Sequence, residues 1–315
     1  MTMTDVRRQH TLAEPVELSG IGVHSGKPVS MTLHPAEDDH GIVFLRSEDG
    51  KDYEIRASHK VVSATELCTV LGDPSSVSVA TVEHLMAALV AYGVDNVLIE
   101  IDGPEVPVFD GSSAAYIDAF EQVGLKQQRR ARRFIKVLKP VRIENGQSYA
   151  ELRPFDGSRF EVEIDFDTPV IGRQKFSGDL SPAVFRDELS RARTFGFMKD
   201  VEGLWAMGYA LGSSLDNTVV LGDDEVVNPE GLRYPDEFVR HKTLDAVGDL
   251  SLAGAPILGL YRSYRGGHRV NINMVKALFA DPDAWEYVEE APTRTVGHGE
   301  LPAGIAAAAF RADVS

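Results

Sequence analysis

Two residues of one predicted helix have the types and spacing of metal ligands. The segment FVRHKTLDAVGDL places His241 and Asp245 four positions apart, with Asp249 one further turn along. Residues at i and i+4 share a helix face, so one helix can present an imidazole and a carboxylate to the same ion. By itself the pattern is more typical of a surface or capping pair. A metal site therefore requires another ligand from elsewhere in the chain.

A second predicted helix offers that ligand. The segment TVEHLMAALVAYGVDNVLIEIDG has apolar residues at helical spacing, and Gly93 can end the helix before a strand. His84 lies nine residues before Gly93, as Asp245 lies nine residues before Gly254. With His84, His241 and Asp245 as ligands, one tetrahedral position stays open, which is typical of a catalytic zinc.

Candidates for an acid and a base accompany these ligands. Glu83 precedes His84 and points about 100° away from it on a helix, so it can accept a proton from a water at the metal. His268 follows two glycines where a strand turns into a helix, and Asp249 can hold it in the charged form. On spacing alone, a solvated glutamate beside a helical histidine is the more frequent arrangement.

Four further polar residues are weaker candidates. Lys242, beside His241, and Arg265, before the glycines, supply positive charge. Thr194 follows a predicted helix that begins at Ser181 and lies at the junction with the second insert, where its hydroxyl can polarise a carbonyl oxygen or bond its own backbone. His24 lies in the glycine-rich turn GIGVHSG, a place where a side chain can contact a ligand.

Composition narrows the classes of protein. The formal net charge of −16 argues against nonspecific nucleic-acid binding, which depends on phosphate neutralisation by Lys and Arg. A single cysteine excludes an intramolecular disulfide framework. No apolar run approaches the ~20 residues of a membrane span, and the N-terminus has no secretory pattern. We therefore expect a cytoplasmic protein without stable membrane insertion, and a monomer by default.

An internal repeat predicts the fold. A strand-turn-strand pattern begins near residue 14 and again near residue 139, and each copy is followed by two helix-like segments separated by a strand. We expect an α+β protein with two similar domains, each a mostly antiparallel sheet with two helices, packed with the helices sandwiched between the sheets.

The predicted domain boundaries follow from that repeat. Residues 1–128 form the first domain, with an inserted small sheet at about 50–80. Residues 129–315 form the second, with a βαβ-like insert at about 197–228 and a flexible C-terminal tail. The basic run at 126–134 is expected to be a solvated linker between them.

The chain resembles a known enzyme family. GIGVHSG, TVEHLMAAL, PEVPVFDGSS, SRARTFGFM, DEFVRHKTLDAVGDL and GGHRVN occur in the order found in the zinc-dependent UDP-3-O-acyl-N-acetylglucosamine deacetylases of lipid A biosynthesis. The resemblance runs from about residue 8 to 288. It implies hydrolysis of the acetamide of a UDP-linked acylated amino sugar to acetate and the free amine, by a water on one zinc ion; His and carboxylate ligands also accept Fe²⁺.

The resemblance also implies roles for individual residues. The ligands would be His84, His241 and Asp245, with Glu83 as base and His268 as acid. Thr194 would assist at the oxyanion, and Lys242 and Asp249 would be supporting or positioning groups. Contacts with substrate are implied for a last group of residues: Phe195, Arg265, His24, Leu204 and Leu215.

Two points stay open at this stage. The segment 197–220 matches the family's hydrophobic passage for an acyl chain, although core packing would give the same pattern. Ser148 stands where some relatives carry a lysine that helps bind the nucleotide. The alternatives are a metal-dependent hydrolase for another acylated amino sugar or nucleotide, and a non-catalytic sugar-nucleotide binder.

Overall fold

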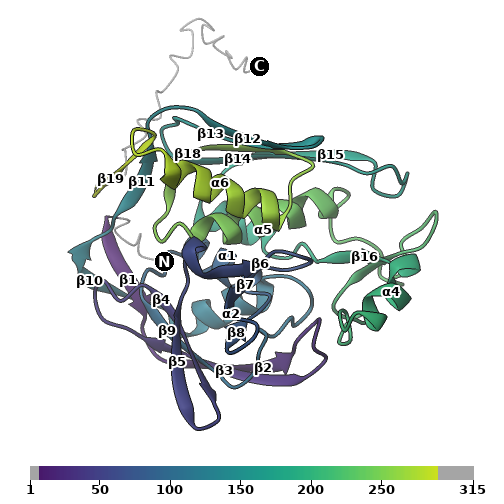
Figure 1. Ribbon diagram of the computed structural model, residues 1–315, viewed down its shortest axis with the longest axis horizontal. Coiled ribbons are helices and arrows are strands. Elements are labelled where there is room, and N and C mark those ends of the chain that lie inside the picture. Colours follow the sequence, from purple (N-terminus) through teal and green to yellow (C-terminus); the bar gives the residue numbers. More distant parts are fainter. Residues whose placement is uncertain (1–6, 290–315) are drawn as a thin grey trace, which may run out of the picture.

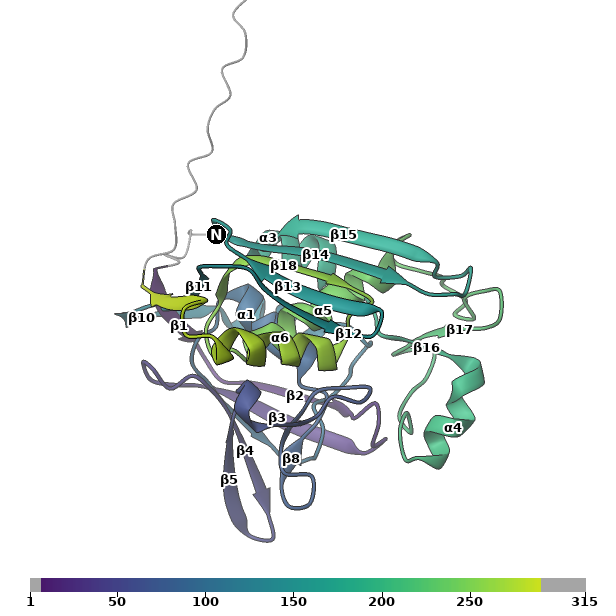
Figure 2. The same ribbon diagram turned by 45° about the horizontal axis from the view of Figure 1, so that its top comes forward.

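Two β-sheets enclose four helices in the computed structural model, which describes residues 7–289 (Figures 1 and 2). One sheet and two helices come from the first half of the chain, and the other sheet and two helices come from the second. The predicted α+β class is confirmed. The four helices are α1 (Glu83–Tyr92), α2 (Ala114–Val123), α5 (Glu237–Ser251) and α6 (His268–Ala280).

The sheet of the first half has five strands in the order β2-β3-β9-β4-β5. Its pairs are antiparallel except β4 with β9, which is parallel. Residues alternate along β3, where Val29, Met31 and Leu33 are buried against the helices and their neighbours are more exposed. The strands are β2 (Val16–Ile21), β3 (Pro28–Pro35), β4 (Ile42–Glu48), β5 (Lys51–Arg56) and β9 (Val97–Ile101).

The sheet of the second half has seven strands. Its main path is β12-β13-β18-β11-β19, and β14 pairs with both β18 and β15. The hairpins β2-β3 and β12-β13 are the two copies of the repeated strand-turn-strand pattern. The strands are β11 (Phe134–Val137), β12 (Val141–Asn145), β13 (Ser148–Arg153), β14 (Ser158–Asp165), β15 (Arg173–Asp179), β18 (Ile257–Tyr264) and β19 (Trp285–Val288).

The helices α1 and α5 form the centre of the molecule. Eight of the ten residues of α1 are buried, since it is covered both by its own sheet and by α5. At Gly248 the two backbones nearly touch: a Cβ at this position would lie 2.0 Å from the carbonyl oxygen of Glu83. Any larger side chain would push the helices apart beside the candidate ligands.

Two smaller units extend from the halves. A three-stranded sheet is made of β6 (Val62–Ala64), β7 (Val70–Gly72) and β8 (Ser78–Val79). It is smaller than the sheet predicted at 50–80, because residues 51–56 belong to the main sheet instead. In the second half, α4 (Val201–Ala206) connects the parallel strands β16 (Phe195–Phe197) and β17 (Val219–Leu221), as a βαβ unit would. The remaining helical segments are short: η1 (His59–Val61), α3 (Pro182–Val184), η2 (Phe185–Leu189) and η3 (Met198–Asp200).

The basic run is a strand, and the prediction of a solvated linker was wrong. Residues Leu125–Ala131 form β10, which pairs antiparallel with β1 (Arg8–Leu12). Alternating Lys, Arg and Gln side chains fit an exposed two-stranded ribbon as well as a linker, so composition alone did not separate the two. The division at residue 128 falls inside β10 and remains a proposal. The tail expected to be flexible lies beyond residue 289, outside the described residues.

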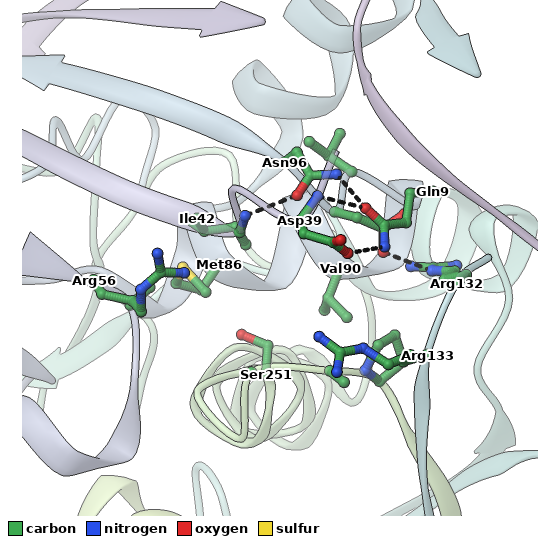
Figure 3. A pocket seen from close by; sticks show the side chains of 17 residues that line it. Gln9, Asp39, Ile42, Arg56, Met86, Val90, Asn96, Arg132, Arg133 and Ser251 are labelled. Carbon is green, nitrogen blue, oxygen red and sulfur yellow. Dashed lines mark hydrogen bonds and ion pairs between the residues drawn. The ribbon is translucent and has the colours of Figure 1, made fainter. Parts of the chain in front are cut away.

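Two cavities lie along the central helices. The larger lies between the halves, beside the first turn of α1. The smaller lies near the C-terminal ends of α1 and α5 (Figure 3).

Candidate active site

The larger cavity, of ≈ 820 Å³, collects most of the residues that the sequence singled out. Both halves line it, and so does the unit containing α4. Of the predicted residues, those that line it are His24, Glu83, His84, Thr194, Phe195, Leu204, His241, Lys242, Asp245, Arg265 and His268. Asp249 lies behind His268, and Leu215 does not line the cavity.

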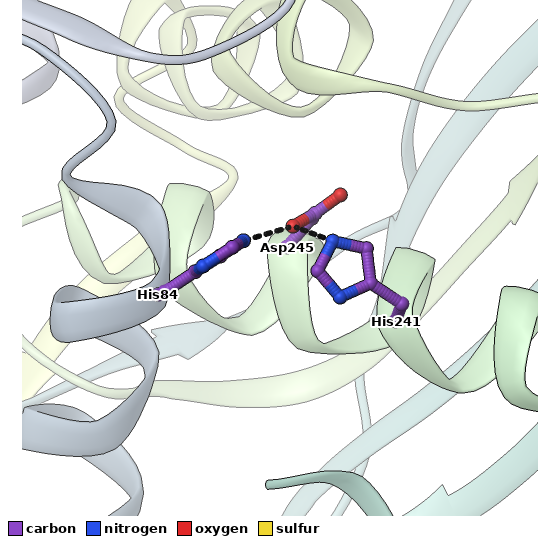
Figure 4. Close-up of side chains that lie close together, drawn as sticks. All are labelled: His84, His241 and Asp245. Carbon is purple, nitrogen blue, oxygen red and sulfur yellow. Dashed lines mark ion pairs between the residues drawn. The ribbon is translucent and has the colours of Figure 1, made fainter. Parts of the chain in front are cut away.

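Three buried side chains converge at its floor (Figure 4). His84 comes from α1, whereas His241 and Asp245 come from successive turns of α5. The Oδ1 atom of Asp245 lies 3.6 Å from Nε2 of His84 and 3.3 Å from Nε2 of His241. Ligand atoms of a tetrahedral zinc lie about 3.3 Å apart, given bonds near 2.0 Å. Both distances to Oδ1 are close to this value, and all three atoms lie within 4.8 Å of one another, so they can share one ion.

The hydrogen bonds around these side chains fit a metal ion. Oδ1 of Asp245 is buried without a hydrogen-bond partner among the described residues, while Oδ2 accepts from Nζ of Lys242 at 2.9 Å. Buried polar atoms are rarely left unpaired, so a cation is the natural partner for Oδ1. Nδ1 of His241 bonds the carbonyl of Ala192 at 3.0 Å, which leaves Nε2 free to coordinate. Burial lowers the pKa of His241 to about 4, so its ring is neutral, as a ligand must be.

A second set of buried groups lies next to these three. His268, the first residue of α6, bonds Oδ2 of Asp249 through Nδ1 at 2.9 Å. Its other nitrogen, Nε2, lies 3.7 Å from Oε1 of Glu83. Glu83 and His268 thus face each other across the cavity floor, with Glu83 adjacent to a candidate ligand.

The charges of this pair depend on their surroundings. Burial alone would lower the pKa of His268, but the carboxylates of Asp249 and Glu83 raise it to about 9. The histidine therefore carries a proton at neutral pH. Burial raises the pKa of Glu83, while the positive charge of His268 opposes this rise. A carboxylate with a raised pKa is a better proton acceptor than a solvated one.

Two residues that the sequence reading missed hold this network in place. The backbone N–H of Thr69 donates to Oε2 of Glu83, and the Thr69 hydroxyl donates to Oδ1 of Asp249. The Asn271 side chain donates to Oδ2 of Asp249 at 2.8 Å. Asn271 lies three residues after His268 on α6, and that spacing could have revealed it. Nothing near Thr69 in the sequence indicates its role.

Aromatic and basic groups form the walls above the floor. The ring of Phe195 lies edge-on to that of His241, with centroids 6.3 Å apart, and Nζ of Lys242 lies 5.9 Å from the Phe195 ring centroid. Arg265 donates to Oε1 of Gln147 and also lies 3.6 Å from a carboxylate oxygen of Asp165. Its guanidinium is thus held at the rim of the cavity.

The turn containing His24 contacts the unit containing α4. Nδ1 of His24 accepts from the N–H of Ala210, and its carbonyl accepts from the N–H of Leu211. The buried carboxylate of Glu105 accepts from the backbone of His24 and of Ser25, which fixes this turn. The first half therefore supports the part of the cavity wall next to α4, where Leu204 and Met207 line the cavity.

Two remaining residues have simple surroundings. Thr194 connects the halves through its backbone, since its N–H donates to the carbonyl of Gly111 and its carbonyl accepts from Val219.

Cys68 is buried, and burial together with the nearby charge of Glu83 raises the pKa of its thiol to about 12. The thiol is therefore protonated and unreactive at neutral pH.

Two histidines and a carboxylate around one open space, beside the buried side chains of Glu83 and His268, are typical of the site of a metal-dependent hydrolase. Residues 9–280 match the model of the family described as LpxC, UDP-3-O-acyl N-acetylglycosamine deacetylase. The chain belongs to this family.

Relatives agree with that assignment. The chain is 57% identical over 282 residues to proteins named UDP-3-O-acyl-N-acetylglucosamine deacetylase from Brucella ovis and Brucella canis, covering 89% of this chain and 98% of each relative. The relative from Brucella melitensis has the same name, identity and coverage. Within residues 7–289, no helix is long and apolar enough to cross a membrane.

Proposed function

We propose that the chain hydrolyses the acetamide of a UDP-3-O-(3-hydroxyacyl)-N-acetylglucosamine, releasing acetate and the free amine, the committed step of lipid A biosynthesis. The observation that carries this proposal is the convergence of three ligand-type side chains with Glu83 and His268 at one cavity floor. Family membership supplies the substrate class.

His84, His241 and Asp245 would hold one Zn²⁺, and Fe²⁺ suits the same donors. When bound, such an ion polarises a carbonyl oxygen and makes a water molecule more acidic. Lys242 neutralises the second oxygen of Asp245, which leaves one oxygen of that carboxylate for the ion.

Glu83 would take the proton of the attacking water. Its Oε2 is held by the N–H of Thr69, so Oε1 is the atom left to face the cavity. The fixed Oε2 prevents the carboxylate from turning away, and burial favours its acceptance of a proton. Thr194, on the cavity wall, would stabilise the oxygen that becomes negative as the carbonyl is attacked.

His268 would supply the proton that the leaving amine needs. Asp249 fixes its ring through Nδ1, so the proton to be transferred is the one on Nε2. Nε2 of His268 faces Oε1 of Glu83. Glu83 can therefore accept one proton from the water while His268 donates another to the leaving amine. The positive charge of the histidine also stabilises negative charge developing on the substrate.

The substrate would extend from the floor in two directions. Leu204 and Met207 line the cavity on the α4 side, where an acyl chain would contact them. Leu215 would contribute only after a movement, since it lies outside the lining. Arg265 lies beside the turn between β12 and β13, where the nucleotide diphosphate would bind and displace Asp165 from Arg265. Phe195 lies between this side and the floor, next to the rings of Phe166 and His241. Ser148 does not replace the missing lysine there, because its hydroxyl donates to the carbonyl of Arg265.

The decisive experiment measures metal content together with acetate release. The zinc-loaded protein should release acetate from the UDP-linked 3-O-acylated sugar but not from UDP-N-acetylglucosamine, and a chelator should abolish the release. Equal activity on both sugars would contradict the assigned substrate. Activity that persists after complete metal removal would contradict the mechanism.

A further inference from the structure

The smaller cavity is separate from the active site. Its volume is ≈ 150 Å³, and none of its lining residues lines the larger cavity. It lies between the halves, with Met86 and Val90 of α1 on one side and Ser251 near the end of α5 on another (Figure 3). An engineered protein cavity of about this size holds a benzene molecule, so a small organic ligand fits.

Three arginines and two aspartates supply the charge of this cavity. Asp95 is neutralised by Arg132, whose Nε lies 2.7 Å from its carboxylate. Asp39 accepts from Gln9 at 2.7 Å and lies 3.3 Å from Nε of Arg130, which is outside the cavity. Both carboxylates therefore have their own cationic partners.

Two guanidinium groups remain without a carboxylate. Arg56 donates to the carbonyl of His40 at 2.7 Å, and Arg133 lies over the ring of Tyr287 at 5.4 Å from its centroid. Neither arginine forms an ion pair with any residue in the range 7–289. In Figure 3 the two side chains reach toward the cavity from opposite sides.

This arrangement favours a ligand with two separated negative groups. A guanidinium binds a carboxylate through two parallel hydrogen bonds, and two guanidiniums on opposite sides match two carboxylates better than one compact phosphate. The amides of Gln9 and Asn96 and the hydroxyl of Ser251 are the other polar side chains nearby, and the apolar lining would contact the carbon chain between the charges.

We propose that this cavity, between the unpaired guanidiniums of Arg56 and Arg133, is a second binding site that takes a short dicarboxylate. The site is independent of the deacetylase reaction, because it shares no residue with the active site. In a chain with a formal net charge of −16, it is a place where positive charge is locally in excess.

Calorimetric titration of the zinc-loaded full-length chain with succinate tests the proposal. Low ionic strength is needed because salt screens exposed charges such as those of Arg56 and Arg133. Saturable binding with Kd on the order of 1 mM is expected. Uncharged succinamide should give no heat, and inorganic phosphate should bind about tenfold more weakly. Phosphate binding as tight as succinate would overturn the dicarboxylate assignment.

Variants locate the binding. Arg56→Gln and Arg133→Gln should each weaken succinate binding about tenfold, since each removes one charged pair. Arg129→Gln is the matched control, because Arg129 is exposed on β10 and does not line the cavity. Absence of binding, or equal binding by all three variants, would overturn the proposal. Succinate that competes with the UDP-sugar and binds both cavity variants normally would be at the active site, which also overturns it.

Discussion

Asp245 shows how far individual residues explain the site. One of its oxygens is occupied by Lys242 and the other is buried with no hydrogen-bond partner among residues 7–289. A buried oxygen without a hydrogen-bond partner is costly, so a cation beside Oδ1 would stabilise the arrangement. The same reasoning accounts for the neutral ring of His241 and the charged ring of His268, which differ because only the latter has a carboxylate on each side.

Replacing Glu83 by glutamine should remove the proposed base and keep the proposed metal site. The amide cannot accept the proton of water at neutral pH, so kcat should fall about 10²-fold or more while zinc content stays at one ion per chain. Acetate release and metal analysis on the same sample check both. Glu121→Gln, on the exposed face of α2, is the control and should leave both unchanged. Full activity in the Glu83 variant would remove its assigned role.

The pair Asp249 and His268 gives a pH prediction. Asp249 and Glu83 raise the pKa of His268 to about 9, so the protonated form persists below that pH and is lost above it. In the wild type, kcat/KM should decline as the pH rises through about 9. Asp249→Asn removes one negative neighbour, lowers the pKa of His268 and moves this decline to lower pH. An unchanged alkaline limb in the pH–rate profile would rule out this coupling.

At the scale of elements, the distance between α1 and α5 sets the geometry of the site. Gly248 lets the two helix backbones approach closely, which brings His84 near the two candidate ligands on α5. The apolar periodicity of both helices and the matching register of His84 and Asp245 could be read from the sequence. The close approach at Gly248 could not, because a glycine within a helix has the same appearance whether it faces solvent or a neighbouring backbone.

Gly248→Ala should therefore damage both stability and metal binding. The added methyl meets the carbonyl oxygen of Glu83 at 2.0 Å, and backbone cannot move aside cheaply. We expect a loss of about 3 kcal/mol in the free energy of unfolding and weaker zinc binding. Denaturant unfolding and zinc titration measure the two effects. Gly203→Ala in α4 is the control: with nothing within 4 Å of its Cβ, it should be neutral or slightly stabilising.

Elements were harder to predict where the composition of a segment fits more than one type of structure. Residues 126–134 were expected to be a solvated linker, yet most of them belong to β10 (Leu125–Ala131), whose backbone pairs with β1 while most of its charged side chains stay outside. The second insert, at about 197–228, was predicted as a βαβ-like unit. Only the structure shows that the turn at His24 bonds the 209–212 segment and so supports the cavity wall.

At the scale of the whole molecule, the proposed ion would join the two halves. One ligand belongs to the first half and two belong to the second, and the unfolded chain does not hold the three together. Removing zinc with a chelator should therefore lower Tm. A free zinc concentration of 1,000 times Kd would add about 4 kcal/mol to the free energy of unfolding. The Tm of His84→Ala should not respond to the chelator. An equal Tm with and without metal in the wild type would contradict a bridging ion.

The sequence predicted the overall plan more reliably than its details. The repeated hairpins and the order of helices were enough to predict an α+β sandwich with the helices inside, because hydrophobic periodicity and turn residues are local signals. The supporting contacts of Thr69 and Asn271 are not local. Thr69, just before β7, and Asn271, on α6, both bond the carboxylate of Asp249 on α5. Such contacts depend on packing that no single stretch of sequence specifies.

The pairing of β1 with β10 has a consequence for how the protein is made. Arg8 and its hydrogen-bond partner Arg129 are 121 positions apart, so β1 cannot pair with β10 until the first half has been synthesised. At about 5–20 residues per second, this delay lasts about ten seconds. During that time β1 lacks its ribbon partner, and its sequence RQHTL, with a single apolar residue among five, disfavours pairing with an apolar strand.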